Sequence, residues 1–237
     1  MLKVEKFVTM SPEQYEIVIE GMRNPMNSWD KSDSYKTHIE NPETLKTADF
    51  QFVLGEKDED LMKRLASAGP THRKYLRMMP VWVTITAPLY WWKEFDTYKV
   101  GTVANSCSTM HKIHAKEFTL EDFSCEKIAI FANHAALHIS DDTFASSFMT
   151  TIDALNHARD EYLANKDKPV AKLYWEQMIQ LLPTSYNQKR TVMLNYEVLA
   201  NIYETRRNHK LDEWHVLCDW IADLPYSHLI IGEEDAE

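Results

Sequence analysis

Glycine is scarce in this sequence, with only 5 among 237 residues. This is well below the roughly 7% of an average protein. The Gly-rich loops GxGxxG and GxxxxGKS, whose backbone N–H groups hold phosphates, are both absent. The sequence therefore excludes a standard Rossmann or P-loop nucleotide site.

Cysteine is also sparse, and its spacing predicts no disulfide framework. Cys107, Cys125 and Cys218 are too scattered to brace a secreted scaffold, and they include no CxxC pair for zinc. No signal-peptide pattern opens the chain. The longest apolar stretch, near Val81 to Trp92, is too short and too threonine-rich to span a bilayer. We expect a cytoplasmic protein without a membrane partner.

Positive charge is outnumbered, because 26 Lys and Arg face 36 Asp and Glu and leave a net charge of −10. Such a balance repels nucleic acid and anionic lipid before contact, so we expect no nucleic-acid partner. A local basic pocket is still compatible with this charge. The length and the 44% hydrophobic content are enough for a full core in one large domain or two small ones.

Helix signals are clear near the start of the chain. Residues 11–14 read Ser-Pro-Glu-Gln, a serine cap with proline at the first helical position and a capping box. This predicts a helix that runs to about Arg23. Residues 24–50 show little periodicity and predict a long connection. Leu61 and Leu65 fit a short helix after it.

A change of period follows in the middle of the chain. Apolar and polar residues alternate over 81–86, which predicts a half-buried strand. Pro88 ends this strand and begins a helix from Leu89 to Phe95. The small polar residues of 97–112 predict an irregular segment, where a site is to be sought first. The C-terminal half shows helical spacing at 141–165, 170–182, 184–207 and 211–222.

Two histidine pairs have spacings that bring imidazoles onto one helical face, His134 with His138 and His111 with His114. Neither pair has the Glu of HExxH or a nearby cysteine, so surface or packed histidines are the favoured interpretation and no metal site is predicted. Cys107 has the chemistry of a nucleophile, but a buried inert thiol is favoured over that role.

Aromatic and amide side chains offer further candidates. Trp91 and Trp92 have faces that suit a planar ligand, although their helical spacing favours core packing. Asn195, Asn201 and Arg206 lie within three turns of one predicted helix. One face would then offer amides and a guanidinium fork suited to phosphate. The alternative is an ordinary solvated helix.

The order of residues in two blocks resembles the flavin-dependent thymidylate synthases. The downstream block is Leu182-Pro183, Asn195, Asn201, Arg206 and Trp214, and the upstream block is Asp60-Leu61, Leu65, Gly69, the strand 81–86, Ala87-Pro88 and Trp92 to Phe95. The resemblance covers roughly residues 58 to 222, about two-thirds of the chain.

Several charged positions of the family are replaced here. The family's Arg-His-Arg, which grips the flavin, falls on Thr97-Tyr98-Lys99, and its flavin-contacting Glu-His falls on Arg77-Met78. A further family arginine aligns with Ile179. In the family's Asn-Glu-x-Ser-x-Arg motif, Asn105 and Ser108 match, while the Glu and Arg do not.

The resemblance implies an α+β fold, with long helices packed on a sheet that includes 81–86 and a strand near 127–131. It implies one domain over residues 1–237, with residues 1–57 outside the matched part and an acidic tail at 232–237. It also implies a homotetramer that transfers a one-carbon unit from methylenetetrahydrofolate to C5 of dUMP, with FAD and NADPH as cofactors. The lost charges imply weak FAD binding.

The resemblance also assigns roles to individual residues. It places Tyr98, Lys99, Asn195 and Asn201 at the flavin. It places Asn105, Ser108 and Arg206 at the nucleotide, with Ser108 as the catalytic residue. The alternative function is a diverged, non-catalytic member of the fold that binds a nucleotide or a protein partner.

Overall fold

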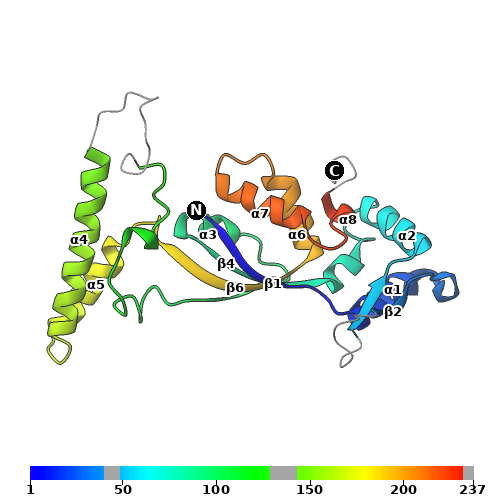
Figure 1. Cartoon of the computed structure of the whole chain (residues 1–237), viewed down its shortest axis with the longest axis horizontal. Coiled ribbons are helices and arrows are strands. Elements are labelled where there is room, and N and C mark those ends of the chain that lie inside the picture. The colour runs from blue at the N-terminus through cyan, green and yellow to red at the C-terminus, as the bar shows by residue number, and fades with distance from the viewer. Residues whose placement is uncertain (40–48, 129–142, 232–237) are drawn as a thin grey trace. The chain divides into compact units, whose positions relative to one another are not determined.

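The computed structural model describes residues 1–39, 49–128 and 143–231, and it has the expected α+β architecture (Figure 1). The helices are α1 (Pro12–Arg23), α2 (Glu56–Ser67), α3 (Leu89–Phe95), α4 (Thr143–Ala164), α5 (Ala171–Leu181), α6 (Tyr196–Arg206), α7 (Asp212–Ala222) and α8 (His228–Ile231). The short 3-10 helices are η1 (Asn24–Met26), η2 (Trp29–Lys31), η3 (Lys74–Met78) and η4 (Leu120–Asp122). The strands are β1 (Lys3–Val8), β2 (Tyr35–Ile39), β3 (Asp49–Val53), β4 (Pro80–Pro88), β5 (Val103–Ser106) and β6 (Asn187–Asn195).

The strands form two sheets. One sheet has the order β1-β4-β6-β5, so neighbouring strands are far apart in the sequence. The other is the antiparallel pair β2-β3, in which Tyr35 lies opposite Val53. In β4 the residues at 81, 83, 85 and 87 are fully or almost fully buried, while those between them are more exposed. The period-two prediction for this strand is therefore confirmed.

The chain groups into two compact units. Unit 1 contains residues 1–3, 85–97 and 105–190, and unit 2 contains 4–84, 98–104 and 191–237. Each strand of the four-stranded sheet has residues in both units. The expectation of one domain over 1–237 stays a prediction.

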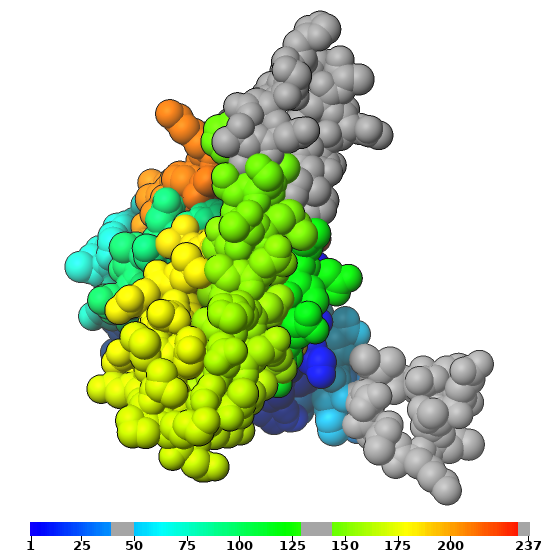
Figure 2. All heavy atoms as spheres, turned by 90° about the vertical axis from the view of Figure 1, so that its left-hand side faces the viewer, coloured from blue at the N-terminus to red at the C-terminus, as the bar shows by residue number. Residues whose placement is uncertain are grey.

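Unit 1 is built on helices α4 and α5, which pack against each other (Figures 1 and 2). Apolar side chains of these helices and of the segment 113–125 share one core, formed by Ile113, Phe118, Phe123, Cys125, Ile152, Leu155, Ala158 and Met178. Phe123 also pairs with Tyr186 in an isolated bridge, so the segment before β6 is tied to this core.

Unit 2 packs its helices around α1 and α6. Helix α1 contacts β3 and η3, and α6 contacts α7 and α8. Tyr15 of α1 stacks on Phe52 of β3 with ring centroids 5.0 Å apart. The Tyr196 hydroxyl donates a hydrogen bond to the carbonyl of Pro225, which joins α6 to the turn before α8.

Most predicted helices are confirmed. Their caps and prolines act on neighbouring residues, so the sequence contains all the signals that start them. The Ser11 hydroxyl oxygen accepts a hydrogen bond from the Gln14 N–H. The Gln14 side chain accepts one from the Ser11 N–H, which completes the capping box of α1. Helix α3 begins after Pro88 as expected. Helices α4, α5 and α7 match the predicted ranges to within a few residues, and α2 contains Leu61 and Leu65 as expected.

Two predictions about these elements are wrong, and a third is tested only in part. The segment 24–50 is more than a connection, since it contains η1, η2 and strand β2. The segment 184–207 is helical only from Tyr196, because β6 precedes it and pairs with β4 and β5. Residues 127 and 128 form a turn and a bend where a strand was expected, and 129–131 lie outside the described residues. Pairing with distant strands decided the state of β6 against its local helical spacing.

Candidate functional site

The residues chosen by the family resemblance divide between the two units. Unit 2 contains Tyr98, Lys99, Asn195, Asn201 and Arg206. Unit 1 contains Asn105 and Ser108.

Asn195 ends strand β6 and caps helix α6. Its backbone is extended, and its side-chain Oδ1 accepts a hydrogen bond of 3.1 Å from the Val198 N–H. The prediction that it lies inside a helix is therefore wrong. Ile202, which is seven residues after Asn195 and four before Arg206 and would share their side of the predicted helix, is fully buried. The expected face of amides and guanidinium does not form on this helix.

The side chain of Asn195 lies against Gly101, a residue that sequence analysis did not single out. Gly101 has a φ of +77°, and a Cβ built on it would lie 2.5 Å from Nδ2 of Asn195. The loop after α3 therefore needs glycine here for two reasons, the left-handed backbone and the close approach of the amide.

Gly101→Ala is expected to lower the free energy of unfolding by about 1 to 3 kcal/mol, because it combines backbone strain with displacement of a helix cap. The matched control is Gly69→Ala, where φ is +98° but no atom lies within 4 Å of the added Cβ. Urea unfolding of both variants measures the difference. An unchanged stability for Gly101→Ala would contradict the close packing of this loop on Asn195.

Arg206 is held by two aromatic residues. Its Nε donates a 2.8 Å hydrogen bond to the Tyr98 hydroxyl, and its guanidinium carbon lies 4.6 Å from the ring centroid of Trp214. The Tyr98 hydroxyl is also 2.8 Å from Oγ1 of Thr205. Trp214 is fully buried, so it gives the cation a rigid surface. The arrangement fixes the direction of the guanidinium.

Lys99 and Asn201, by contrast, are exposed.

Asn105 lies in strand β5 and Ser108 follows this strand, both in unit 1. The Ser108 hydroxyl oxygen accepts hydrogen bonds from the N–H groups of Met110 and His111, at 3.3 and 2.9 Å. It therefore caps a turn, and it keeps its own proton to donate. Asn105 is exposed.

Cys107 is exposed, so the buried-thiol interpretation is wrong. Its backbone is nevertheless fixed, because its N–H donates to the carbonyl of Lys189 and its carbonyl accepts from the side chain of Gln188, both at 2.9 Å. Trp91 and Trp92 are fully buried, which confirms the core-packing interpretation.

The histidine pairs form no metal site among the described residues. His111 and His114 lie in turns, where the helical-face argument does not apply, and His134 and His138 lie outside the described residues. Across 1–39, 49–128 and 143–231, no cluster of three or more His, Cys, Asp or Glu side chains is arranged to hold a metal ion. Within the same ranges, no helix is both long and apolar enough to cross a bilayer.

A buried ion pair in unit 2 was missed by sequence analysis. Nε of Arg23 lies 2.5 Å from Oδ1 of Asp58, and the two side chains are 4% and 0% exposed. Oδ2 of Asp58 accepts hydrogen bonds from the hydroxyls of Ser32 and Ser34 and from the N–H groups of Asp33 and Ser34. Asp33 in turn accepts from the first N–H groups of α2, at positions 57 and 58.

This network decides the protonation state of Asp58. Burial acts to raise the pKa of this carboxyl, but the hydrogen bonds from Ser34, Ser32 and Arg23 together outweigh it and hold the pKa below its ordinary value. Asp58 therefore stays ionised and ties the loop 28–34 to helices α1 and α2.

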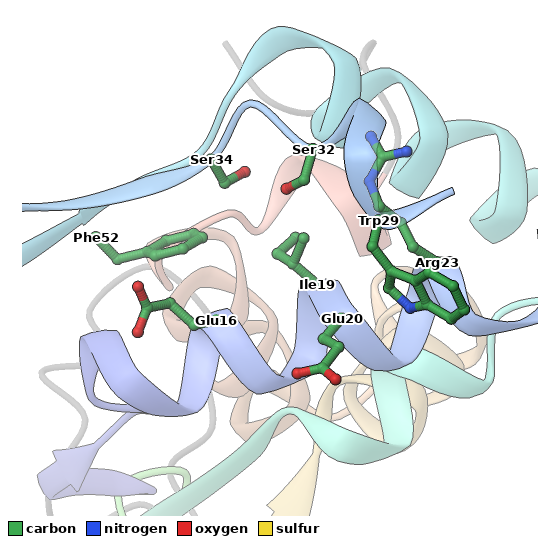
Figure 3. A pocket seen from close by; sticks show the side chains of 8 residues that line it. All are labelled: Glu16, Ile19, Glu20, Arg23, Trp29, Ser32, Ser34 and Phe52. Carbon is green, nitrogen blue, oxygen red and sulfur yellow. The ribbon is translucent and has the colours of Figure 1, made fainter. Parts of the chain in front are cut away.

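Beside the network lies a pocket of about 290 Å³ (Figure 3). Its lining residues are Glu16, Ile19, Glu20, Arg23, Trp29, Ser32, Ser34 and Phe52. Figure 3 shows Phe52 at one end, Trp29 and Arg23 at the other, and Ile19 of α1 between them. Trp29 is fixed by a 2.8 Å hydrogen bond from its Nε1 to the side chain of Asn24. Arg23, Ser32 and Ser34 of this lining also belong to the Arg23–Asp58 network, so the first role of these three side chains is structural.

Comparison with known proteins identifies the fold. No protein-family model matches this sequence, and no curated protein matches it. Among solved structures, thymidylate synthase X (ThyX) from Helicobacter pylori with FAD and dUMP has a TM-score of 0.60 at 14% sequence identity, covering 100% of this chain and 98% of that one. A second structure of this flavin-dependent enzyme, also complexed with FAD and dUMP, has a TM-score of 0.58 at 15% identity, covering 100% and 99%.

The chain has a ThyX-like fold. A UMP/dUMP methylase, PolB from Streptomyces cacaoi bound with 5-Br dUMP, is also similar, with a TM-score of 0.54 at 13% identity, covering 94% of this chain and 88% of that one. At such low identity the likeness concerns the fold alone. The resemblance seen in the sequence is thus confirmed as a diverged ThyX-like fold, and the roles of individual residues stay predictions.

Proposed function

We propose that this protein is a diverged flavin-dependent thymidylate synthase-like enzyme of the cytoplasm. It would transfer a one-carbon unit from methylenetetrahydrofolate to C5 of dUMP, with FAD and NADPH as cofactors. The observation that carries this proposal is the ThyX-like fold, which extends over 100% of the chain to proteins crystallised with FAD and dUMP. Free thiols at all three cysteines are in keeping with a reducing compartment.

The nucleotide would be bound by charge and by directed hydrogen bonds. Arg206 has its guanidinium directed by Tyr98 and Trp214, which reduces the entropy lost when it binds an anion. Ser108 would donate its remaining proton to a carbonyl of the pyrimidine, because its oxygen already accepts two backbone hydrogen bonds. Asn105 would add an exposed amide.

Unit 2 offers a phosphate-bearing flavin only a few hydrogen-bond donors. Lys99 supplies one exposed cation, Asn201 an exposed amide, and Asn195 the Nδ2 group that lies beside Gly101. Tyr98 adds a hydroxyl that already contacts Thr205 and Arg206. When bound, FAD would supply the redox and one-carbon chemistry. The protein side chains would hold it in place.

We expect FAD to bind weakly. The segment Thr97-Tyr98-Lys99 offers one cation, and each lost charge-assisted hydrogen bond is worth about 1.5 to 3 kcal/mol. The purified protein should lack stoichiometric flavin absorption and should gain it only on titration with excess FAD. Stoichiometric yellow protein straight from purification would show that other residues supply the missing donors.

The second candidate is a diverged, non-catalytic member of the fold that binds a nucleotide or a protein partner. The loss of several charged positions favours it, since Thr97-Tyr98-Lys99 stands where the family has Arg-His-Arg. The test is product formation from dUMP with FAD, NADPH and methylenetetrahydrofolate all supplied. Production of dTMP supports the enzyme, whereas dUMP binding without dTMP supports the non-catalytic alternative.

The assembly proposed with this function is a homotetramer. Large apolar side chains stand exposed on α4 and α5, among them Phe144 at 66%, Leu173 at 51% and Leu181 at 42%. Contact with other subunits would cover such side chains. Light scattering should give about four times the chain mass of 27.8 kDa. A monomer at micromolar concentration would contradict the proposal.

A further inference from the structure

An open groove of about 700 Å³ lies at the turn between α4 and α5, in unit 1. This turn is at the lower end of the two helices in Figures 1 and 2. The side chains that give the groove its chemistry are His111, Tyr162, Lys166, Lys168, Lys172 and Trp175. A volume of this size is within the range of small-molecule sites.

The groove is positively charged in a chain of net charge −10. Three lysines line it, and none of its lining residues is acidic. Lys168 is bonded to the neutral side chain of Asn165 at 3.0 Å. Nζ of Lys172 lies 3.6 Å from Oε1 of Glu176, and such an exposed pair contributes so little free energy that an incoming anion can replace the carboxylate.

Two further facts support a positive potential at this turn. Helix α5 begins here without an acidic residue in its first turn, so no carboxylate within that turn offsets the partial positive charge of its N-terminus. The pKa of nearby His114 is lowered, first by burial and then by the charges of Lys166, Lys112 and Arg159. The acids beside the groove, Asp167 and Glu176, are not part of its lining.

The groove also offers a fixed aromatic face. Nε1 of Trp175 donates a 3.0 Å hydrogen bond to the carbonyl of Met110, which holds the indole in one orientation. The ring of His111 is almost parallel to it, at 16° and a centroid distance of 6.5 Å. Since every nucleobase has a π face, a fixed indole beside cations suits a ligand that combines a planar ring with a phosphate.

We propose that this groove binds a purine nucleoside monophosphate, with the phosphate on Lys168 and Lys172 and the base stacked on Trp175. A purine is favoured over a pyrimidine because its larger ring covers more of the indole. The site uses none of the residues assigned to dUMP or FAD above. It is therefore a second nucleotide site, independent of the proposed reaction.

The test is calorimetric titration of AMP, adenosine and inorganic phosphate into the full-length protein. AMP should bind at least tenfold more tightly than either fragment. The double variant Lys168→Gln/Lys172→Gln should weaken AMP binding at least tenfold, and Trp175→Leu should do the same. The matched control is Lys31→Gln/Lys57→Gln, which removes two exposed lysines from unit 2 and should leave AMP binding unchanged.

Three results would overturn the proposal. These are absence of AMP binding by the wild type at millimolar concentration, equal weakening in the groove variant and the control, and adenosine binding as tight as AMP. Melting temperatures equal to the wild type exclude unfolding of the lysine variants. Retained dUMP binding in the groove variant separates failure here from failure of the proposed function.

Discussion

Asp58→Ala is expected to lower the free energy of unfolding by about 3 to 5 kcal/mol, because it leaves the buried guanidinium of Arg23 without its counter-charge. The two side chains are 0% and 4% exposed, so water cannot replace the lost carboxylate. The variant also loses the acceptor for the hydroxyls and N–H groups of the loop 32–34. Chemical denaturation followed by circular dichroism gives the measurement.

The matched control is Asp60→Ala on the same helix. Asp60 pairs with Arg64 at 3.0 Å, but both side chains are 68% exposed. Such a pair contributes about 0 to 1 kcal/mol, so this variant should stay close to the wild type. If the two variants lost equal stability, the buried pair would not hold the loop to α1 and α2. The double variant Arg23→Met/Asp58→Leu should lose less than Asp58→Ala alone, since no unpaired charge is left behind.

Arg206→Ala is expected to weaken dUMP binding by about 2 to 3 kcal/mol, near a hundredfold, through loss of a charge-assisted contact. Arg206→Lys should recover only part of the affinity, because an ammonium lacks the planar fork that Tyr98 and Trp214 direct. Calorimetric titration of dUMP with FAD present gives the affinities. Melting temperatures show whether the loss of packing on Trp214 unfolds the protein.

Two controls separate nucleotide binding from packing. Arg207 is exposed and lies 5.8 Å from the ring of Tyr203, so Arg207→Ala should leave dUMP affinity almost unchanged. Tyr98→Phe removes the hydrogen bond to Nε of Arg206 but keeps a ring, and it should weaken binding by less than Arg206→Ala. Equal losses at Arg206 and Arg207 would indicate a diffuse basic surface. No dUMP binding by the wild type would reject the nucleotide site.

Local signals in the sequence were sufficient for most helices. The capping box at 11–14 and the proline at 88 act on residues within one turn, so the starts of α1 and α3 follow from neighbours in the chain. The alternation at 81–86 likewise predicted β4, because one buried face of a strand requires it. The order of residues over two blocks was enough to indicate the ThyX-like fold, although overall identity to the solved structures is only 13 to 15%.

The geometry of the candidate site was harder to predict from the sequence. The structure places Tyr98, Asn195 and Arg206 in one unit, whereas the sequence had been interpreted with Asn195 inside a helix. The sequence also gave no reason to select Gly101, whose close approach to Asn195 joins the loop after α3 to the start of α6. The available signal was a glycine in a short polar turn, which is too common to be informative alone.

Helix caps, prolines and the period of apolar residues act locally, so the elements that they cause could be predicted from the sequence. Three features depend on the folded chain: 187–195 is a strand, Asp58 pairs with Arg23, and Tyr98 directs Arg206. These features join residues up to 108 positions apart. Their energies come from strand pairing, desolvation and ring contacts that arise only when the chain has folded, because no local pattern encodes which distant groups will meet.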